Sequence, residues 1–251
     1  MLELQQVGVR FGGLKAVDDV SISVKRGERR AVIGPNGAGK TTLFNAITGI
    51  RPPSTGKILF DGRNVTRLAP HLRAHRGMSR TFQITNLFLQ LTVGENMQLA
   101  LRGLSPRRFS MFGSPQLSAA ERERAAHALH VSRLAERSDT VVSELSYGEQ
   151  RQLEMAMALA AEPRLLLLDE PAAGLSPAER VIVVEIIRSL SRDLTVMLIE
   201  HDMDLVLNLV DWVTCLDNGK LLAEGAPDEI RANQAVQDVY LGKARRDARD
   251  S

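Results

Sequence analysis

The stretch GPNGAGKT, residues 34–41, fits the pattern G-x-x-x-x-G-K-[ST], which is typical of loops that cradle nucleotide phosphates. Gly37 and Gly39 lack a Cβ atom, so the backbone there can curl closely around an anion. The curl directs successive N–H groups inward, at the positive end of the helix that follows. We expect Lys40 to reach the β- and γ-phosphates and the Thr41 hydroxyl to ligate Mg²⁺.

The sequence on either side supports a phosphate loop between a strand and a helix. Residues 30–33 (RAVI) are predicted to form a buried strand, and residues 42–47 (TLFNAI) a helix with one apolar face. A simple glycine turn between the two elements is the alternative. It explains the glycines but gives no reason for Lys40 and Thr41, so we favour the phosphate loop.

The composition is that of an ordinary globular protein. The chain has 251 residues, of which 44% are hydrophobic and 25% charged, which suits one large domain or a core with a subdomain. A net charge of +2 gives no reason to expect a nucleic-acid partner. Cys215 is the only cysteine, which excludes an internal disulfide and fits a reducing compartment. We expect Cys215 to lie in a buried strand.

Neither a membrane helix nor a signal peptide is expected. No apolar run approaches the roughly 18 residues that a membrane-spanning helix needs. The first residues, MLELQQ, lack both a basic start and a long apolar stretch. The sequence therefore predicts a cytoplasmic protein that can still dock on a membrane partner.

Strand and helix patterns alternate at both ends of the chain, with a helical stretch between them. Residues 2–24 are predicted to form two antiparallel edge strands, and residues 92–161 to be mostly helical around a loop at 103–118. The remaining predictions are strands at 57–60, 78–82, 165–168 and 194–199, a helix opening at Ser176, a type I′ turn at Asn218-Gly219 and a frayed charged tail at 243–251.

Two acids, Asp169 and Glu170, follow four consecutive leucines at 165–168. A fully buried strand places both carboxylates at its C-terminal end, where ligands of open α/β sheets bind. One acid there suits a water-bound Mg²⁺, and the second suits a general base for an attacking water. The alternative, that both acids only cap the strand, is less compatible with a phosphate loop in the same chain.

The stretch LSYGEQ, residues 145–150, precedes a long predicted helix. Ser146 with Glu149 three residues later forms a capping box, which is a sufficient structural explanation. The same hydroxyl, the N–H of Gly148 and the positive helix end also form an anion site. Glycine in a first helical turn costs about 1 kcal/mol relative to alanine, and close approach of a ligand accounts for it.

Together these motifs resemble those of the nucleotide-binding subunits of ATP-binding cassette (ABC) transporters, in the order of that family and along almost the whole chain. The resemblance implies an α/β fold with a P-loop NTPase core of the ABC ATPase type, an N-terminal antiparallel β region and an inserted α-helical subdomain. The implied division is a core at 1–83 and 162–225, a helical signature subdomain at 84–161, and C-terminal helices with a charged tail at 226–251.

The resemblance also assigns roles to individual residues. The implied nucleotide contacts are Phe11, Gly34, Asn36, Gly37, Ala38, Gly39, Lys40, Thr41, Thr42, Ser146, Gly148 and Glu149. Phe11 is expected to stack on adenine, although a core position would explain it when it is taken alone. Thr41, Gln83 and Asp169 are implied at Mg²⁺. Catalysis is implied for Lys40, Gln83, Glu170 as the base and His201 as the switch histidine, although His201 alone could cap a helix.

The family pattern further implies a head-to-tail dimer. Each ATP lies between the phosphate loop of one subunit and the LSYGEQ helix of the other, and Gln83 with residues 87–97 passes the motion to membrane subunits. Three positions depart from the pattern: Tyr147 replaces the first glycine of the signature, Glu149 replaces the usual residue before its final glutamine, and Ser176 replaces an aspartate. Ser146 and Gly148 remain, so the signature is expected to function, whereas communication through Ser176 stays open.

The type of transporter rests on shorter stretches. Residues 80–83, 172–177, 199–203 and 239–242 resemble importer subunits for branched-chain amino acids, and urea importer subunits look similar. The implied partners are transmembrane permease subunits, a second ATPase subunit of the same or a related chain and, indirectly, a periplasmic binding protein. The implied location is the cytoplasmic face of the inner membrane.

The sequence disfavours two other functions. An ABC ATPase acting on DNA or ribosomes usually carries a coiled-coil insertion, a second cassette or a basic patch, and this sequence has none of them. A module that binds ATP without turnover is disfavoured by Glu170 and His201. The sequence does not reveal the transported cargo, because other chains of a transporter select it.

Overall fold

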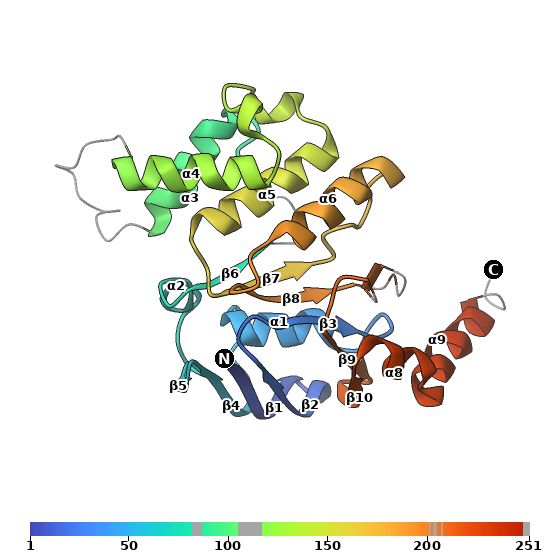
Figure 1. Cartoon of the computed structure of the whole chain (residues 1–251). Coiled ribbons are helices and arrows are strands. Elements are labelled where there is room, and N and C mark those ends of the chain that lie inside the picture. Colours follow the sequence, from blue (N-terminus) through green and yellow to red (C-terminus); the bar gives the residue numbers. More distant parts are fainter. Residues whose placement is uncertain (82–86, 105–116, 201, 203–204, 207, 248–251) are drawn as a thin grey trace. The chain divides into compact units, whose positions relative to one another are not determined.

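The computed structural model describes residues 1–81, 87–104, 117–200, 202, 205–206 and 208–247 (Figure 1). The chain divides into two compact units. The first contains residues 1–73 and 195–251, and the second contains residues 74–194. Helix α2 (Pro70–Ala74) lies where the chain passes from the first unit to the second.

An antiparallel sheet forms the N-terminal part of the first unit. Its strands are β1 (Leu2–Phe11), β2 (Leu14–Val24), β4 (Thr55–Phe60) and β5 (Arg63–Asn64), in the order β2-β1-β4-β5. Register shifts interrupt the β1–β2 pairing between Leu4 and Arg10. The predicted pair of antiparallel strands at 2–24 is therefore confirmed.

The core strands of the first unit are β3 (Arg29–Ile33), β8 (Thr195–Ile199), β9 (Trp212–Asp217) and β10 (Lys220–Gly225). Strand β3 pairs in parallel with β8 on one side and β9 on the other, and both β3 and β8 are buried along their whole length. Strands β9 and β10 form an antiparallel hairpin. Asn218 and Gly219 have φ angles of 47° and 78°, which confirms the predicted type I′ turn.

Helix α1 (Lys40–Thr48) follows β3 and is held at its C-terminal end by a buried arginine. The guanidinium of Arg73 donates to the carbonyls of Ala46 (2.7 Å) and Ile47 (2.6 Å), and also to those of Thr66 (2.9 Å) and Leu68 (3.0 Å). Burial lowers the pKa of Arg73 to about 10, so it remains charged at neutral pH. Two of these carbonyls, those of Ala46 and Ile47, belong to the last turn of α1, where the regular i+4 partners of the helix are missing.

The second unit combines two parallel strands with several helices. Strand β6 (Met78–Arg80) pairs with β7 (Leu165–Asp169), and β7 is buried throughout. The helices are α3 (Val93–Leu104), α4 (Ala119–Val131), α5 (Tyr147–Ala160) and α6 (Pro177–Ser189), with 3-10 turns at Ala135–Arg137 and Val142–Glu144. Helices α3, α4 and α5 share one apolar cluster that includes Met97, Leu129 and Leu153 (Figure 1).

The end of the chain differs from the sequence prediction. Helices α8 (Pro227–Ala232) and α9 (Gln234–Asp247) follow β10, and the backbone of α9 remains helical through Asp247. We predicted a frayed tail from residue 243, and that was wrong for residues 243–247. The residues in this run are mostly alanine, arginine and lysine, which favour helix and extend one that has already begun.

Among the described residues, no helix is both long and apolar enough to cross a bilayer.

Candidate functional site

The phosphate loop lies in the first unit, between the end of β3 and the start of α1. Gly34, Gly37 and Gly39 have φ angles of 142°, 81° and 100°, which favour glycine. A Cβ atom on Gly34 would lie 2.2 Å from the Leu216 carbonyl oxygen, and one on Gly39 would lie 2.3 Å from the Ala16 carbonyl oxygen. Neighbouring backbone therefore requires two of these glycines, independently of any ligand.

Lys40 begins α1 and is 7% exposed. Its ammonium group donates to the carbonyl oxygens of Gly34 (2.7 Å) and Pro35 (3.0 Å), so the side chain spans the loop that it follows. Thr41 and Asn36 are exposed, and Ala38 is buried. The loop thus places a cation, a hydroxyl and a helix N-terminus around one short stretch of backbone.

Tyr240 of α9 contacts the same loop. The N–H of Gly34 donates to the Tyr240 hydroxyl at 2.9 Å. Burial raises the pKa of Tyr240 to about 12, so the hydroxyl stays protonated under ordinary conditions. Tyr240 therefore binds the N–H of Gly34, and Lys40 binds its carbonyl oxygen. Sequence reasoning quoted Tyr240 only within a stretch typical of a family and missed this contact.

Phe11 ends β1 and is 46% exposed. The guanidinium of Arg51 lies 4.6 Å from the centre of its ring, which is a cation–π contact. The Arg51 guanidinium also donates to the Arg10 carbonyl at 3.3 Å. Phe11 is therefore a surface aromatic that a cation holds in place, and the alternative of a core position is excluded by its exposure.

The acid pair lies in the second unit, at the end of β7. Asp169 is the last strand residue and is 2% exposed, and its Oδ2 lies 2.6 Å from a guanidinium nitrogen of Arg80 on β6. Among the described residues, its Oδ1 is buried without a hydrogen-bond partner. A buried carboxylate oxygen in that state suits a metal ion or a metal-bound water.

Glu170 adopts a left-handed backbone conformation with φ 48°. Side chains other than glycine, asparagine and aspartate are uncommon there, and such strain gathers at functional sites. The sequence identified both acids but assigned no role to Arg80, which it quoted only as part of a stretch at 80–83.

The LSYGEQ segment begins α5 as predicted. Ser146 caps the helix and forms a capping box with Glu149. Both donors of the proposed anion site already bind a carboxylate of the same unit. Oε1 of Glu179 accepts from the Gly148 N–H at 3.0 Å and from the Ser146 hydroxyl at 3.2 Å.

Glu179 belongs to the first turn of α6, where it also completes the capping box of Ser176. Its Oε2 accepts from the Ser176 hydroxyl (2.7 Å) and from the Ser176 N–H (3.0 Å). Hydrogen bonds from Ser176 and then from the Gly148 N–H lower the pKa of Glu179. A Cβ atom on Gly148 would lie 2.5 Å from Oε1 of Glu179. In this structure the close approach that we predicted at Gly148 is therefore made by Glu179.

The predicted site residues fall into three groups. Those of the first unit are Phe11, Gly34, Asn36, Gly37, Ala38, Gly39, Lys40, Thr41 and Thr42. Those of the second unit are Ser146, Gly148, Glu149, Asp169 and Glu170. Gln83 and His201 lie outside the described residues.

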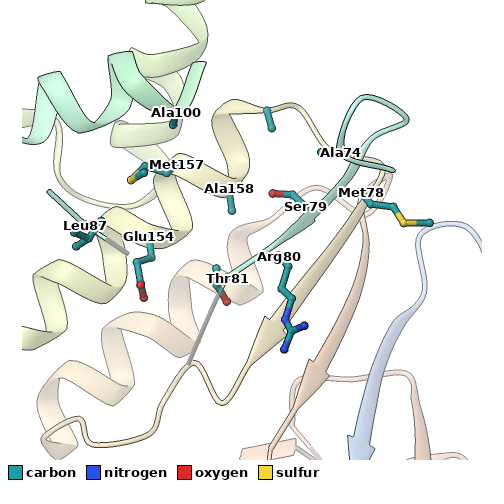
Figure 2. A pocket seen from close by; sticks show the side chains of 11 residues that line it. Ala74, Met78, Ser79, Arg80, Thr81, Leu87, Ala100, Glu154, Met157 and Ala158 are labelled. Carbon is teal, nitrogen blue, oxygen red and sulfur yellow. The ribbon is translucent and has the colours of Figure 1, made fainter. Parts of the chain in front are cut away.

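A mostly apolar pocket of about 240 Å³ lies within the second unit (Figure 2). Its lining residues are Ala74, Met78, Ser79, Arg80, Thr81, Leu87, Ala100, Glu154, Met157, Ala158 and Ala161. In Figure 2, Leu87, Met157 and Glu154 face Ser79 and Thr81 across the hollow. Arg151 holds the Glu154 carboxylate at 2.9 Å. The pocket thus has apolar walls with one fixed carboxylate.

Comparisons with known proteins agree over nearly the whole chain. Residues 17–173 match the family model described as ABC transporter, and residues 220–245 match the model described as branched-chain amino acid ATP-binding cassette transporter. The chain is 41% identical to BraF of Pseudomonas aeruginosa, a high-affinity branched-chain amino acid transport ATP-binding protein, with 97% of this chain and 98% of BraF covered. It is 40% identical, with the same coverage, to LivG of Escherichia coli, which carries the same description.

Solved structures give the same result. The ADP conformation of MJ1267, an ATP-binding cassette of an ABC transporter, matches with a TM-score of 0.85 and 32% identity, over 96% of this chain and 98% of that one. A dimeric post-hydrolysis state of the cassette MJ0796, bound to ADP and Pi, matches with a TM-score of 0.75 and 26% identity, over 90% and 99%.

Proposed function

Because the chain belongs to the ABC transporter family, we propose that it is the ATP-binding and ATP-hydrolysing subunit of an importer for branched-chain amino acids. Its fold is the ABC cassette fold, with an antiparallel N-terminal sheet and a mixed core sheet. The match at residues 220–245 favours branched-chain amino acids over urea or short amides. The family also disfavours the alternative of an ATPase acting on DNA or ribosomes.

The observation that carries the proposal is the phosphate loop. Three glycines with positive φ, the start of α1 and the Lys40 ammonium converge on one stretch of backbone. This arrangement offers N–H donors and a positive charge to a triphosphate. Lys40 then exchanges carbonyl acceptors of its own loop for phosphate oxygens, and Phe11 offers an exposed ring to the adenine.

The residues present also fit Mg²⁺. Asp169 has a buried oxygen that lacks a partner among the described residues, and Thr41 has an exposed hydroxyl at the start of α1. Oxygen donors of this kind are the ligands that Mg²⁺ prefers. The ion would neutralise charge on the β- and γ-phosphate oxygens, and Thr41, Asp169 and Gln83 are the residues that we assign to it.

Glu170 is assigned as the general base. In hydrolysis a water oxygen forms a bond to the γ-phosphorus while the bond from that phosphorus to the bridging oxygen of ADP breaks, and the water proton passes to the Glu170 carboxylate. Lys40 and His201 stabilise the charge that develops on the transferred phosphoryl group. ADP and inorganic phosphate are then released.

Two such subunits are proposed to pair head to tail around ATP. The phosphate loop and the LSYGEQ helix belong to different units of the chain, so one nucleotide can bridge two subunits. The partner is a second copy or a related cassette. The dimeric structure of MJ0796 supports cassette pairing as a general property of this fold.

The pocket of the second unit is proposed as the docking site for a transmembrane permease subunit at the cytoplasmic face of the inner membrane. Its mostly apolar lining suits a short helix with an apolar face. Thr81 and Leu87, which flank the stretch with Gln83, both line it. Movement at the nucleotide can therefore reach the permease through this stretch.

The test combines uptake with ATP turnover. In cells that lack the gene, the wild-type chain should restore uptake of labelled leucine, isoleucine and valine. Glu170→Gln should bind ATP with wild-type affinity, hydrolyse it at less than about 1% of the wild-type rate and fail to restore uptake. Glu123→Gln, an exposed glutamate on α4, is the matched control and should behave as wild type. Normal ATP turnover by Glu170→Gln would contradict the assignment of Glu170 as the general base. Uptake of urea in place of the three amino acids would contradict the assigned cargo.

A further inference from the structure

The LSYGEQ end of α5 holds an anion in this structure, and the anion is a side chain of the same subunit. One oxygen of Glu179 receives both the Gly148 N–H (3.0 Å) and the Ser146 hydroxyl (3.2 Å). These are the two donors to which the proposed function assigns the phosphate of the opposite subunit's ATP. The carboxylate therefore stands where that phosphate would bind.

A phosphate and this carboxylate cannot share the position. The Glu179 side chain lies so close that a Cβ atom on Gly148 would be within 2.7 Å of its Oε1, Cδ and Cγ atoms. Both groups are anionic, and like charges at such a separation repel each other. An incoming nucleotide must therefore displace the carboxylate before it can accept the same hydrogen bonds.

The local structure permits this displacement. Glu179 lies at the third position of α6, where its second oxygen accepts from the Ser176 N–H and hydroxyl. Rotation of the carboxyl end can release Ser146 and Gly148 while the contact with Ser176 remains, so α6 keeps its cap. The residue is only partly buried, so water can solvate the charge once it has moved.

We propose that Glu179 occupies the phosphate position of the LSYGEQ motif in the unpaired subunit and sets the affinity of ATP-driven pairing by competing with the nucleotide. The proposal rests on the function assigned above. In the absence of a correctly seated triphosphate, Glu179 satisfies the donors of the motif and places a negative charge on the pairing surface. A triphosphate delivered by the opposite phosphate loop replaces it.

The test removes the charge and keeps the cap. Glu179→Gln preserves side-chain length and the capping-box pattern, in which glutamine serves as well as glutamate. Both Glu179→Gln and its parent carry Glu170→Gln, so that ATP is not consumed. Pairing is measured by sedimentation velocity across a series of Mg-ATP and protein concentrations. Glutamine has one acceptor oxygen where glutamate has two, so with that oxygen on Ser176 its NH2 group cannot accept from Ser146 or Gly148. Glu179→Gln should therefore pair at roughly fivefold to tenfold lower protein concentration.

Three controls separate the explanations. Glu185→Gln changes an exposed glutamate of the same helix, one that pairs with Arg133, and should leave pairing unchanged. Calorimetry with ADP on the unpaired subunit should give equal affinities for all variants, because the phosphate loop belongs to the first unit and Glu179 to the second. Glu179→Asp keeps the charge but shortens the side chain, and it should also strengthen pairing because it cannot reach both Ser146 and Ser176.

Equal or weaker pairing of Glu179→Gln and Glu179→Asp would overturn the proposal, as would the absence of pairing by every variant at saturating ATP. Neither result affects the assignment of the phosphate loop, which depends on ATP binding to the unpaired subunit. Loss of ATP binding by the parent would instead contradict the proposed function.

Discussion

Replacing Arg80 with methionine tests how the second unit holds its buried acid. The Arg80–Asp169 pair joins β6 to β7 at 2.6 Å, with side-chain exposures of 6% and 1%. Methionine has similar length but no charge, so Asp169 would remain buried without a compensating cation. Breaking a buried pair from one side typically costs about 3–5 kcal/mol, which for a chain of this size lowers the melting temperature by about 10 °C.

The assay is a double-mutant cycle of Arg80→Met, Asp169→Asn and the double variant, followed by urea denaturation and thermal melting without nucleotide. The double variant should recover about 2 kcal/mol relative to Arg80→Met alone, because it buries no unpaired charge. Arg133→Met is the matched control. Its ion pair with Glu185 is nearly as short, at 2.8 Å, but both side chains are about half exposed, so the loss should stay within about 1 kcal/mol.

Two outcomes would refute this reasoning. Arg80→Met could prove as stable as the Arg133→Met control, in which case the Asp169 charge does not depend on Arg80. The double variant could also be no more stable than Arg80→Met, in which case the loss comes from packing rather than from an uncompensated carboxylate.

Further predictions concern the first unit. Lys40→Ala should weaken ATP binding by at least about tenfold in calorimetry, and wild-type affinity would contradict the phosphate-loop assignment. Tyr240→Phe leaves the buried Gly34 N–H without its acceptor, so ATP affinity should fall about threefold to tenfold while kcat stays within about twofold; an unchanged affinity would confine Tyr240 to packing α9. Burial raises the pKa of Cys215 to about 11, so the unfolded thiol ionises first and stability should fall by about 2 kcal/mol between pH 9 and 11. In Cys215→Ala this fall in stability with pH should be absent, as measured by urea denaturation at several pH values. The same dependence of stability on pH in both proteins would argue against a raised pKa of Cys215.

Local sequence patterns predicted most of the helices and strands around the candidate site. Glycine spacing identified the phosphate loop, and four leucines identified the strand that ends in the acid pair. The S-x-x-E pattern identified the capping boxes of Ser146 and Ser176, while that of Ser118 was missed. Each of these signals lies within a few neighbouring residues, where backbone preference and burial leave a direct trace.

The contacts that the sequence did not reveal join distant residues. Tyr240 is 206 positions from Gly34, and Arg80 is 89 positions from Asp169. Their residue types are common and follow no local pattern, so only the folded chain brings them to their partners. Gly148 illustrates a third case. The sequence correctly indicated a close approach there, but the approaching group in this structure is Glu179 and not a ligand.

The buried Arg73 has a consequence for the resting state of the protein. It places a permanent cation against the negative pole of α1, while the positive pole of that helix is the end offered to the triphosphate. The negative pole is thus compensated by a side chain of the same subunit, independently of any substrate. The helix needs no anion to stay wound, and ATP meets a receptor that is already assembled. Loss of this internal cation would weaken the helix end by about 0.3–2 kcal/mol, and that part of the nucleotide's binding free energy would go into holding α1 rather than into pairing.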